Sequence, residues 1–197
     1  MPPRPTRRVP TVIVPGWQGS GPGHWQLLLA EALRADGRQV HEPPLPDVDT
    51  PSLPAWLSTL RETLAPLPDD GFDVVCHSLG AVLWLHHAAR SSETPSPARV
   101  VLVSPPSPDR SLAPAEFQAF LPPPLDVDAV RAAAGGTVLV ASDNDPYCPE
   151  GAAIAYGRPL KLPVTVIPGG GHLNVDSGHG PWPAMLSWCG RDNLAFY

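Results

Sequence analysis

The chain has 197 residues, of which 43% are hydrophobic and 16% are charged. This length and composition are typical of a globular protein with one hydrophobic core, so we expect residues 1–197 to fold as a single domain. The 29 prolines stand mostly between apolar stretches, where they mark loops and argue against a disordered tail. The formal net charge of −6 offers no basic face of the kind that nucleic acids require, which excludes DNA or RNA as the expected partner.

The N-terminal residues do not have the pattern of a secretory signal. Residues 1–8 carry three arginines, but the apolar stretch that follows, residues 9–14, is too short for the hydrophobic part of a signal peptide. No apolar run approaches the 18 residues of a membrane span. We therefore expect a soluble, cytoplasmic protein that does not bind membranes.

The three cysteines, Cys76, Cys148 and Cys189, are odd in number and widely spaced. This spacing predicts neither a disulfide framework nor a zinc motif, and the chain contains no His-Glu-x-x-His sequence. We expect reduced thiols, no metal ion and no cofactor.

Short runs rich in β-branched residues alternate along the chain with longer stretches of helical pattern. Strands are predicted at residues 9–14, 73–76, 100–103, 137–141 and 164–167, with a weaker sixth strand at 39–41. Helices are predicted at residues 25–35, with Gly37 as the stop, and at 53–64, 79–90, 126–134, 150–156 and 182–188. In the first helix, the residues expected on the buried face are Leu27, Leu28, Ala32 and Leu33.

The order and the composition of these elements predict the fold class. Alternation of strands with helices favours a parallel sheet. The strand runs are almost unbroken in their hydrophobicity, which indicates burial of both faces of the sheet by flanking helices. The sequence therefore predicts an α/β fold, a three-layer α/β/α sandwich with a mainly parallel sheet of five to six strands, and leaves the strand order open.

The sharpest chemical signal lies at residues 74–81, which read Val-Val-Cys-His-Ser-Leu-Gly-Ala. Here a predicted strand runs directly into a predicted helix, with Ser78 at the joint. Small residues two positions before and after the serine, Cys76 and Gly80, allow the strand and the helix to approach each other. This pattern is typical of a nucleophile elbow, a strained turn that exposes the serine hydroxyl above a helix N-terminus.

Two backbone N–H groups are candidates for an oxyanion hole. The N–H of Leu79 would point, together with the helix dipole, at the negative oxygen that develops during acyl transfer. The second donor is expected from the Gly-rich loop 15–21, because this loop lies beside the elbow in such folds, and we choose the N–H of Trp17. Taken alone, the loop would equally suit an ordinary glycine-rich turn.

A serine hydroxyl needs a base to become a nucleophile, and the base needs a carboxylate that holds its tautomer. Asp145 follows the strand predicted at 137–141, and His172 follows the strand predicted at 164–167. The carboxyl ends of parallel strands meet at one edge of the sheet, and the order Ser, Asp, His is that of α/β-hydrolases. We therefore predict Ser78 as the nucleophile, His172 as its base and Asp145 as the group that orients the base.

Each of these residues also has an ordinary structural interpretation. Asp145 before a proline is a common turn, and His172 after three glycines could cap a loop. Such an interpretation of all three residues requires three coincidences at three strand ends in the correct order. Asp143 competes with Asp145, and the residue pattern alone leaves that choice open. His77 is expected to pack or to form a hydrogen bond rather than to react.

Several motifs together resemble a known group, the compact serine hydrolases typified by retinoblastoma-binding protein nine and its bacterial relatives. The motifs cover residues 14–17, 20, 24–25, 77–80, 103–105, 142, 145–147, 171–174, 177–178 and 180–183, which span nearly the whole chain. The resemblance implies a minimal α/β-hydrolase without a large cap, and it selects Asp145 over Asp143 because the family's aspartate directly precedes Pro-Tyr. Cys76 departs from the pattern, since such elbows often have Gly or Ala there, but a thiol is small enough that we expect the turn to survive. The chain has no Leu-x-Cys-x-Glu sequence, so binding to the retinoblastoma protein is not implied.

These residues predict a serine hydrolase that cleaves small, partly hydrophobic ester, thioester or activated amide substrates through an acyl-enzyme on Ser78. Its expected partner is therefore a small-molecule acyl substrate. The segment 105–135 is long enough to roof the pocket, and Phe117, Phe120 and Leu121 in it predict a partly apolar cover. The same three residues would also serve an acyltransferase, cyclase or thioesterase of a biosynthetic pathway, and a catalytically silent binding protein on the same fold is a further alternative.

Overall fold

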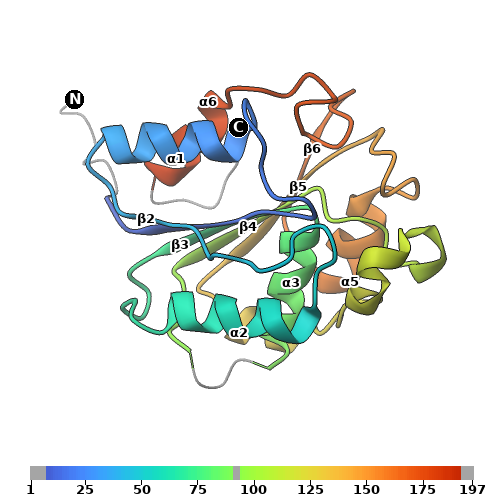
Figure 1. The fold of residues 1–197 in the computed structure, drawn as a ribbon, viewed down its shortest axis with the longest axis horizontal. Coiled ribbons are helices and arrows are strands. Elements are labelled where there is room, and N and C mark those ends of the chain that lie inside the picture. Colours follow the sequence, from blue (N-terminus) through green and yellow to red (C-terminus); the bar gives the residue numbers. More distant parts are fainter. Residues whose placement is uncertain (1–7, 91–93, 192–197) are drawn as a thin grey trace.

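The computed structural model describes residues 8–90 and 94–191. At its centre lies one sheet of six parallel strands, in the order β2-β1-β3-β4-β5-β6, with helices on both faces (Figure 1). The strands are β1 (Thr11–Val14), β2 (Val40–His41), β3 (Asp73–His77), β4 (Arg99–Val103), β5 (Thr137–Ser142) and β6 (Val164–Ile167). The predicted α/β/α sandwich is confirmed, and all six strands lie where the sequence predicted them.

The helices divide unequally between the two faces of the sheet. The helices α1 (Trp25–Ala35) and α6 (Pro183–Cys189) cover one face, and α2 (Leu53–Leu64), α3 (Leu79–Ala88), α4 (Val127–Ala132) and the short α5 (Arg158–Leu160) cover the other. Shorter helical turns are η1 (Arg110–Leu112), η2 (Ala115–Phe120) and the π-helical η3 (Ala153–Gly157). The helix predicted at 150–156 is thus a π-helical turn that continues into α5. Within the described residues, no helix is long and apolar enough to cross a membrane.

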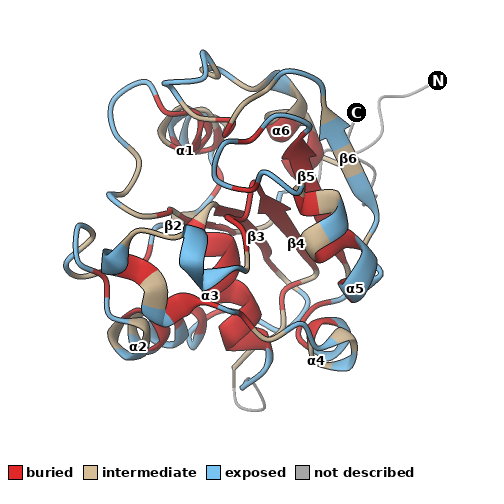
Figure 2. Cartoon of the chain, turned by 90° about the vertical axis from the view of Figure 1, so that its right-hand side faces the viewer, coloured by how far each residue is buried: buried red, intermediate tan, exposed pale blue. Residues whose placement is uncertain are grey.

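The core lies along the central strands, which are buried over their whole length (Figure 2). Successive side chains point to opposite faces, so Val74 packs in the cluster with α2 and α3 while Val75 packs in the cluster with α1. The edge strand β6 differs, because Val164 and Val166 are 37% and 45% exposed. The expected burial of both faces is therefore incomplete at β6, although Gly157 of η3 lies directly against the side chain of Val164.

The helix α1 has the predicted ends but a different buried face. Its buried residues are Trp25, Gln26, Leu29, Ala30 and Leu33, so only Leu33 of the four expected residues lies on that face. The cause is tertiary hydrogen bonding at the first turn. The indole N–H of Trp25 donates to the carbonyl oxygen of Leu173 at 2.8 Å, and the side-chain amide of Gln26 donates to that of Val14 at 3.0 Å. These two bonds set the rotation of the helix about its axis.

The order of the strands determines where a ligand can bind. From β1 the chain moves outward to β2 and then returns to β3, whereas β3, β4, β5 and β6 follow one another across the sheet. The loops after β1 and β3 therefore leave the sheet in opposite directions. The crevice between them is a topological switch point, the place where open α/β sheets bind ligands.

Candidate active site

Ser78 lies at the turn between β3 and α3, with backbone angles φ 53° and ψ −122°. A non-glycine residue adopts this region only when its surroundings enforce it, and such strain is common at nucleophile elbows. The N–H of Ser78 donates to the carbonyl oxygen of Val103 at 2.8 Å, which ties the turn to the next strand. Gly80 is required because a Cβ there would lie 2.5 Å from the carbonyl oxygen of Pro15. Cys76 is fully buried before the turn, and the turn forms as expected with a thiol at this position.

The structure brings the three predicted site residues into one hydrogen-bonded chain. The Oγ of Ser78 lies 2.9 Å from Nε2 of His172, and Nδ1 of the same imidazole lies 2.8 Å from Oδ2 of Asp145 and 3.0 Å from Oδ1. A carboxylate accepts the Nδ1 proton, which leaves the Nε2 lone pair for the serine hydroxyl. The three residues follow β3, β5 and β6, so the carboxyl edge of the sheet collects them. This arrangement can remove a proton from the serine as it attacks a carbonyl.

Asp143, the competitor of Asp145, has a different partner. Its Oδ1 accepts a hydrogen bond from the N–H of Gly169 at 2.7 Å. Asp145 is buried and also accepts a hydrogen bond from the N–H of Tyr147 at 2.9 Å, which turns its carboxylate toward the imidazole. Geometry thus agrees with the choice that the family resemblance implied.

Ser142, the last residue of β5, and Asn144, which lies between the two aspartates, also hold the loop that carries His172. The Oδ1 of Asn144 accepts a hydrogen bond from the N–H of Gly171 at 2.7 Å, and the hydroxyl of Ser142 donates to the carbonyl oxygen of Gly171. Four consecutive residues at the end of β5 therefore bind the loop 169–172. Sequence reasoning missed this role for Ser142 and Asn144, although an uninterrupted polar run at the end of an apolar strand is a signal that points to it.

A further hydrogen bond joins the nucleophile's strand to the histidine loop. His77 Nε2 lies 3.0 Å from the carbonyl oxygen of His172, and because a carbonyl only accepts, this nitrogen carries the proton. Burial lowers the pKa of His77 well below its usual value, and the neighbouring His172 lowers it further. His77 is therefore a neutral donor that packs and forms a hydrogen bond, as expected.

The loop after β1 lies directly against the elbow. A Cβ on Gly16 would be 2.8 Å from Cβ of Ser78 and 3.3 Å from the backbone nitrogen of Leu79. The loop is fixed from outside, since the indole N–H of Trp17 donates to the carbonyl oxygen of Asp49 at 2.9 Å. Within residues 8–90 and 94–191, the backbone N–H groups of Trp17 and Leu79 form no hydrogen bond. Among the described residues, neither of the two N–H groups expected to hold an oxyanion is therefore bonded to another backbone group.

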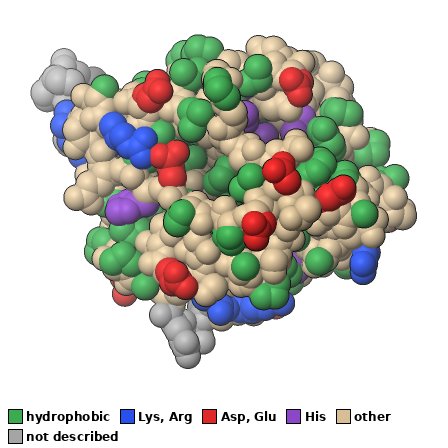
Figure 3. Space-filling view, in the orientation of Figure 1, with side chains coloured by type: hydrophobic (Ala, Val, Ile, Leu, Met, Phe, Trp, Pro, Cys, Tyr) green, Lys and Arg blue, Asp and Glu red, His purple; other side chains and the backbone are tan. Residues whose placement is uncertain are grey.

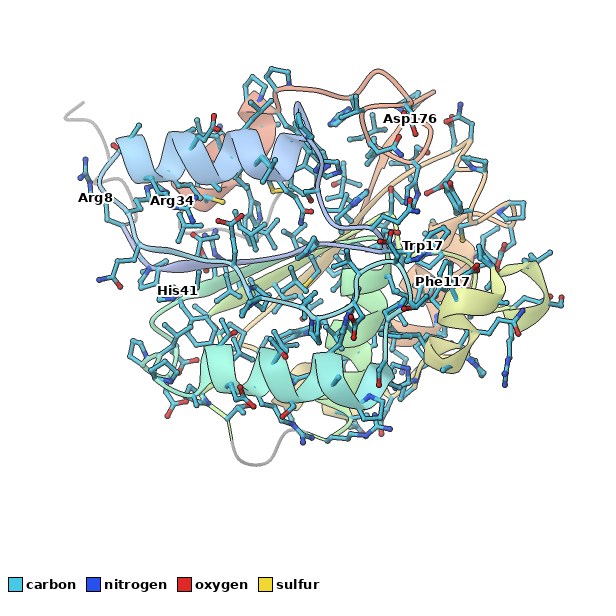
Figure 4. All side chains as sticks on the ribbon, in the orientation of Figure 1. Arg8, Trp17, Arg34, His41, Phe117 and Asp176 are labelled. Carbon is cyan, nitrogen blue, oxygen red and sulfur yellow. The ribbon has the colours of Figure 1, made fainter. Side chains whose placement is uncertain are left out.

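A cavity of about 350 Å³ is lined by Ser78 and His172. Figure 3 shows histidine side chains inside a hollow that hydrophobic and acidic side chains surround. The rings of Trp17 and Phe117 form one wall, 5.4 Å apart between centroids, and Figure 4 shows these two side chains next to each other. The ring of Tyr147 packs against the imidazole of His172, with centroids 4.5 Å apart and ring planes tilted by 53°.

The predicted apolar cover is correct only in part. Phe117 lines the cavity, but Phe120 and Leu121 are buried in the core, where Phe120 packs edge-on against Trp56. Among the described residues that line the cavity, the one Asp, Glu, Lys or Arg is Asp176. Within the described part of the chain, the cavity lining is therefore aromatic on one side and includes no arginine or lysine.

Other reactive side chains do not compete with Ser78. Cys76, Cys148 and Cys189 are free and buried. Burial raises the pKa of all three thiols, to about 12 for Cys148 and for Cys189, which keeps them protonated and poorly nucleophilic. In the described part of the chain, no group of three or more His, Cys, Asp or Glu side chains is arranged to hold a metal ion.

A serine on a strand-to-helix turn, next to the switch point of a parallel sheet, is the architecture of the α/β-hydrolase fold. The class of protein is therefore an α/β-hydrolase. Within this class the chain belongs to the serine hydrolase family, because the sequence profile of that family matches residues 11–189. The match confirms the resemblance that the motifs indicated.

Solved structures of other proteins have the same fold. The ydeN gene product of Bacillus subtilis is 23% identical, with a TM-score of 0.77 over 91% of this chain and 95% of that chain. A protein described as a YdeN-like hydrolase from Pectobacterium atrosepticum is 22% identical, with a TM-score of 0.70 over 92% and 89% of the two chains. Est1E from Butyrivibrio proteoclasticus is 16% identical, with a TM-score of 0.59 over 86% and 81%. A search of curated proteins gave no match.

Proposed function

We propose that the protein hydrolyses small, partly hydrophobic esters, thioesters or activated amides through an acyl-enzyme on Ser78. In the first step the Ser78 hydroxyl gives its proton to Nε2 of His172 while its oxygen bonds to the substrate carbonyl carbon. The carbonyl oxygen becomes an oxyanion that the N–H groups of Leu79 and Trp17 hold. His172 then gives the proton to the leaving group, and the bond to that group breaks.

Water completes the cycle by the same route. It gives a proton to His172 as its oxygen attacks the acyl carbon, and the proton returns to Ser78 when the acid leaves. Asp145 keeps the proton of the imidazole on Nδ1 and stabilises the imidazolium that forms in each step.

One observation carries the proposal: the unbroken hydrogen-bonded chain from Ser78 through His172 to Asp145, with its serine end at the cavity. Membership of the serine hydrolase family supports the same chemistry. The aromatic wall of Trp17 and Phe117 favours an apolar acyl or alcohol group over a highly polar one.

The test is covalent labelling. We expect a fluorophosphonate to modify the native chain once, and mass spectrometry to place the modification on the peptide that contains residue 78. Ser78→Ala should abolish the modification, while Ser58→Ala, which changes an exposed serine on α2, should leave it unchanged. An unlabelled native chain would support the alternative of a silent binding protein and refute the proposal.

A product assay separates hydrolysis from acyl transfer. With p-nitrophenyl butyrate and an added amine or alcohol, we expect butyric acid as the main product. Butyryl amide or ester in excess of the acid would instead assign the same residues to an acyltransferase, cyclase or related biosynthetic enzyme.

A further inference from the structure

His24 lines the cavity beside the nucleophile but has no part in the proposed reaction. It is the N-cap of α1, and its Nδ1 accepts a hydrogen bond from the N–H of Gln26 at 3.2 Å. Because Nδ1 accepts, the proton of the neutral ring is on Nε2. Among the described residues, none is a hydrogen-bond partner of this Nε2–H group.

The ring of His24 is held in place. Its centroid lies 5.0 Å from that of His77 and 5.6 Å from that of Trp25. His77 in turn lies 5.0 Å from His172, so three imidazoles form a row that starts at the proposed base. Burial, followed by the influence of His172, lowers the pKa of His24 to about 4. Near neutral pH the residue is therefore an uncharged, oriented donor.

Capping the helix does not require an imidazole. Asn, Asp or Ser caps a helix at least as well, and none of them would carry a second polar atom as far from the backbone. The feature that His24 adds to a cap is the Nε2–H group. The oxyanion of the reaction has its own donors in Trp17 and Leu79, so this third donor is available for another part of the substrate.

We propose that Nε2–H of His24 donates a hydrogen bond to an uncharged oxygen of the substrate other than the reacting carbonyl oxygen. This inference rests on the proposed function and narrows it to acyl compounds that carry an ether, hydroxyl or second carbonyl oxygen near the scissile bond. An uncharged oxygen is favoured over a carboxylate because the lining residues that the structure describes include Asp176 and no arginine or lysine. His24 is thus a specificity-determining residue.

Three esters of nearly equal shape test the inference. Butyl butyrate has no extra oxygen, butyl methoxyacetate has one on the acyl side, and 2-methoxyethyl butyrate has one on the alcohol side. Their dissociation constants are measured by NMR titration of the full chain with Ser78→Ala, which binds without turnover. The same titrations are made with His24→Asn added, because asparagine keeps the cap but lacks the distant N–H group.

We expect one of the two ether esters to bind more tightly than butyl butyrate. His24→Asn should reduce the ratio of the two dissociation constants, butyl butyrate over ether ester, by about 2- to 10-fold, the range for one neutral hydrogen bond. The ester that responds tells whether the contact is on the acyl or the alcohol side. A matched control is His179→Asn, which changes another partly buried histidine and should leave the ratio unchanged.

The inference would be overturned if His24→Asn left the ratio of dissociation constants relative to butyl butyrate unchanged for both ether esters. So would a nitrogen-detected NMR spectrum with the proton of His24 on Nδ1 near neutral pH. Neither readout depends on turnover, whereas fluorophosphonate labelling of the native chain reports on Ser78. Failure of the proposed hydrolysis and failure of the role of His24 are therefore distinguishable.

Discussion

Gly16→Ala adds one methyl group between the loop after β1 and the nucleophile elbow. That methyl carbon would lie 2.8 Å from Cβ of Ser78 and 3.3 Å from the nitrogen of Leu79. Ordinary contact begins at 3.4 Å, so the loop and the elbow must separate by roughly half an ångström. The methyl group would also stand next to the N–H of Leu79, where the oxyanion is expected.

We expect this substitution to reduce activity far more than stability. Loss of one oxyanion donor costs about 10²–10³ in kcat, and a misplacement of about 1 Å costs about 10². Gly16 lies outside the left-handed region, so an alanine there does not meet the penalty of a positive φ. The overlap should lower the free energy of unfolding by about 1–3 kcal/mol. Alanine also reduces the conformational entropy of the unfolded chain, which raises the free energy of unfolding by about 0.4–1 kcal/mol.

The assay compares kcat/KM for p-nitrophenyl butyrate, and the second-order rate of fluorophosphonate labelling, between the native chain and two variants. Gly21→Ala is the matched control, because a Cβ at this position of the same loop meets nothing within 4 Å. We expect a fall of about 10²–10³ in both rates for Gly16→Ala and less than about threefold for Gly21→Ala. A folded Gly16→Ala variant within fivefold of the native rates would refute the assignment of the oxyanion site to this interface.

Three further predictions concern the carboxylate beside His172, the loop that carries His172, and two other buried histidines. Asp145→Asn should lower kcat by about 10⁴-fold, because an amide no longer selects the imidazole tautomer with its proton on Nδ1, and steady-state kinetics of a variant with native circular dichroism checks this. Asn144→Ala should lower kcat by about tenfold at unchanged KM, because the N–H of Gly171 loses its acceptor and the histidine loop becomes less well held. Asn144→Asp keeps an acceptor oxygen and should restore most of the rate. Burial lowers the pKa of His24 and of His87 from 6.5 to about 4, so below pH 6.5 the unfolded chain binds more protons than the folded one. The free energy of unfolding, measured with urea, should therefore fall by at least about 2 kcal/mol between pH 7 and pH 5. A value that is constant over this range would contradict the burial of these rings.

The strands and the position of Ser78 at a strand-to-helix turn could be predicted because local sequence determines them. An apolar run that ends in a serine between small residues has few structural interpretations, and Ser78 follows β3 as that pattern requires. His172 was also identifiable, since a histidine after a glycine run at a strand end points to the same edge of the sheet. In both cases the chemistry restricts the residue type and the turn restricts its neighbours.

The choice between Asp143 and Asp145 could not be made from strand periodicity. The strand β5 ends at Ser142, so neither aspartate belongs to it and alternation does not apply. The turn at Pro146 directs one carboxylate to the imidazole, and the other binds the N–H of Gly169. The family resemblance contained this information, whereas the pattern of apolar and polar residues did not.

The buried face of α1 could not be predicted from the sequence of the helix. Hydrophobic periodicity predicted a stripe through Leu27 and Leu28, but both are only partly buried. The hydrogen bonds of Trp25 and Gln26 to carbonyl groups of distant strands and loops decide the orientation of the helix. Such partners are distant in the sequence, so a pattern within the helix cannot contain them.

The same reasoning explains why the supporting residues of the site were harder to find than the reacting ones. A nucleophile and its base must be particular residue types, because only certain side chains carry the required lone pair or proton. Ser142 and Asn144 bind backbone groups of the histidine loop, and many polar side chains of suitable length can bind an N–H or a carbonyl. The chemistry therefore constrains their residue types weakly, and their positions constrain them strongly, which only the arrangement of β5 and β6 in space reveals.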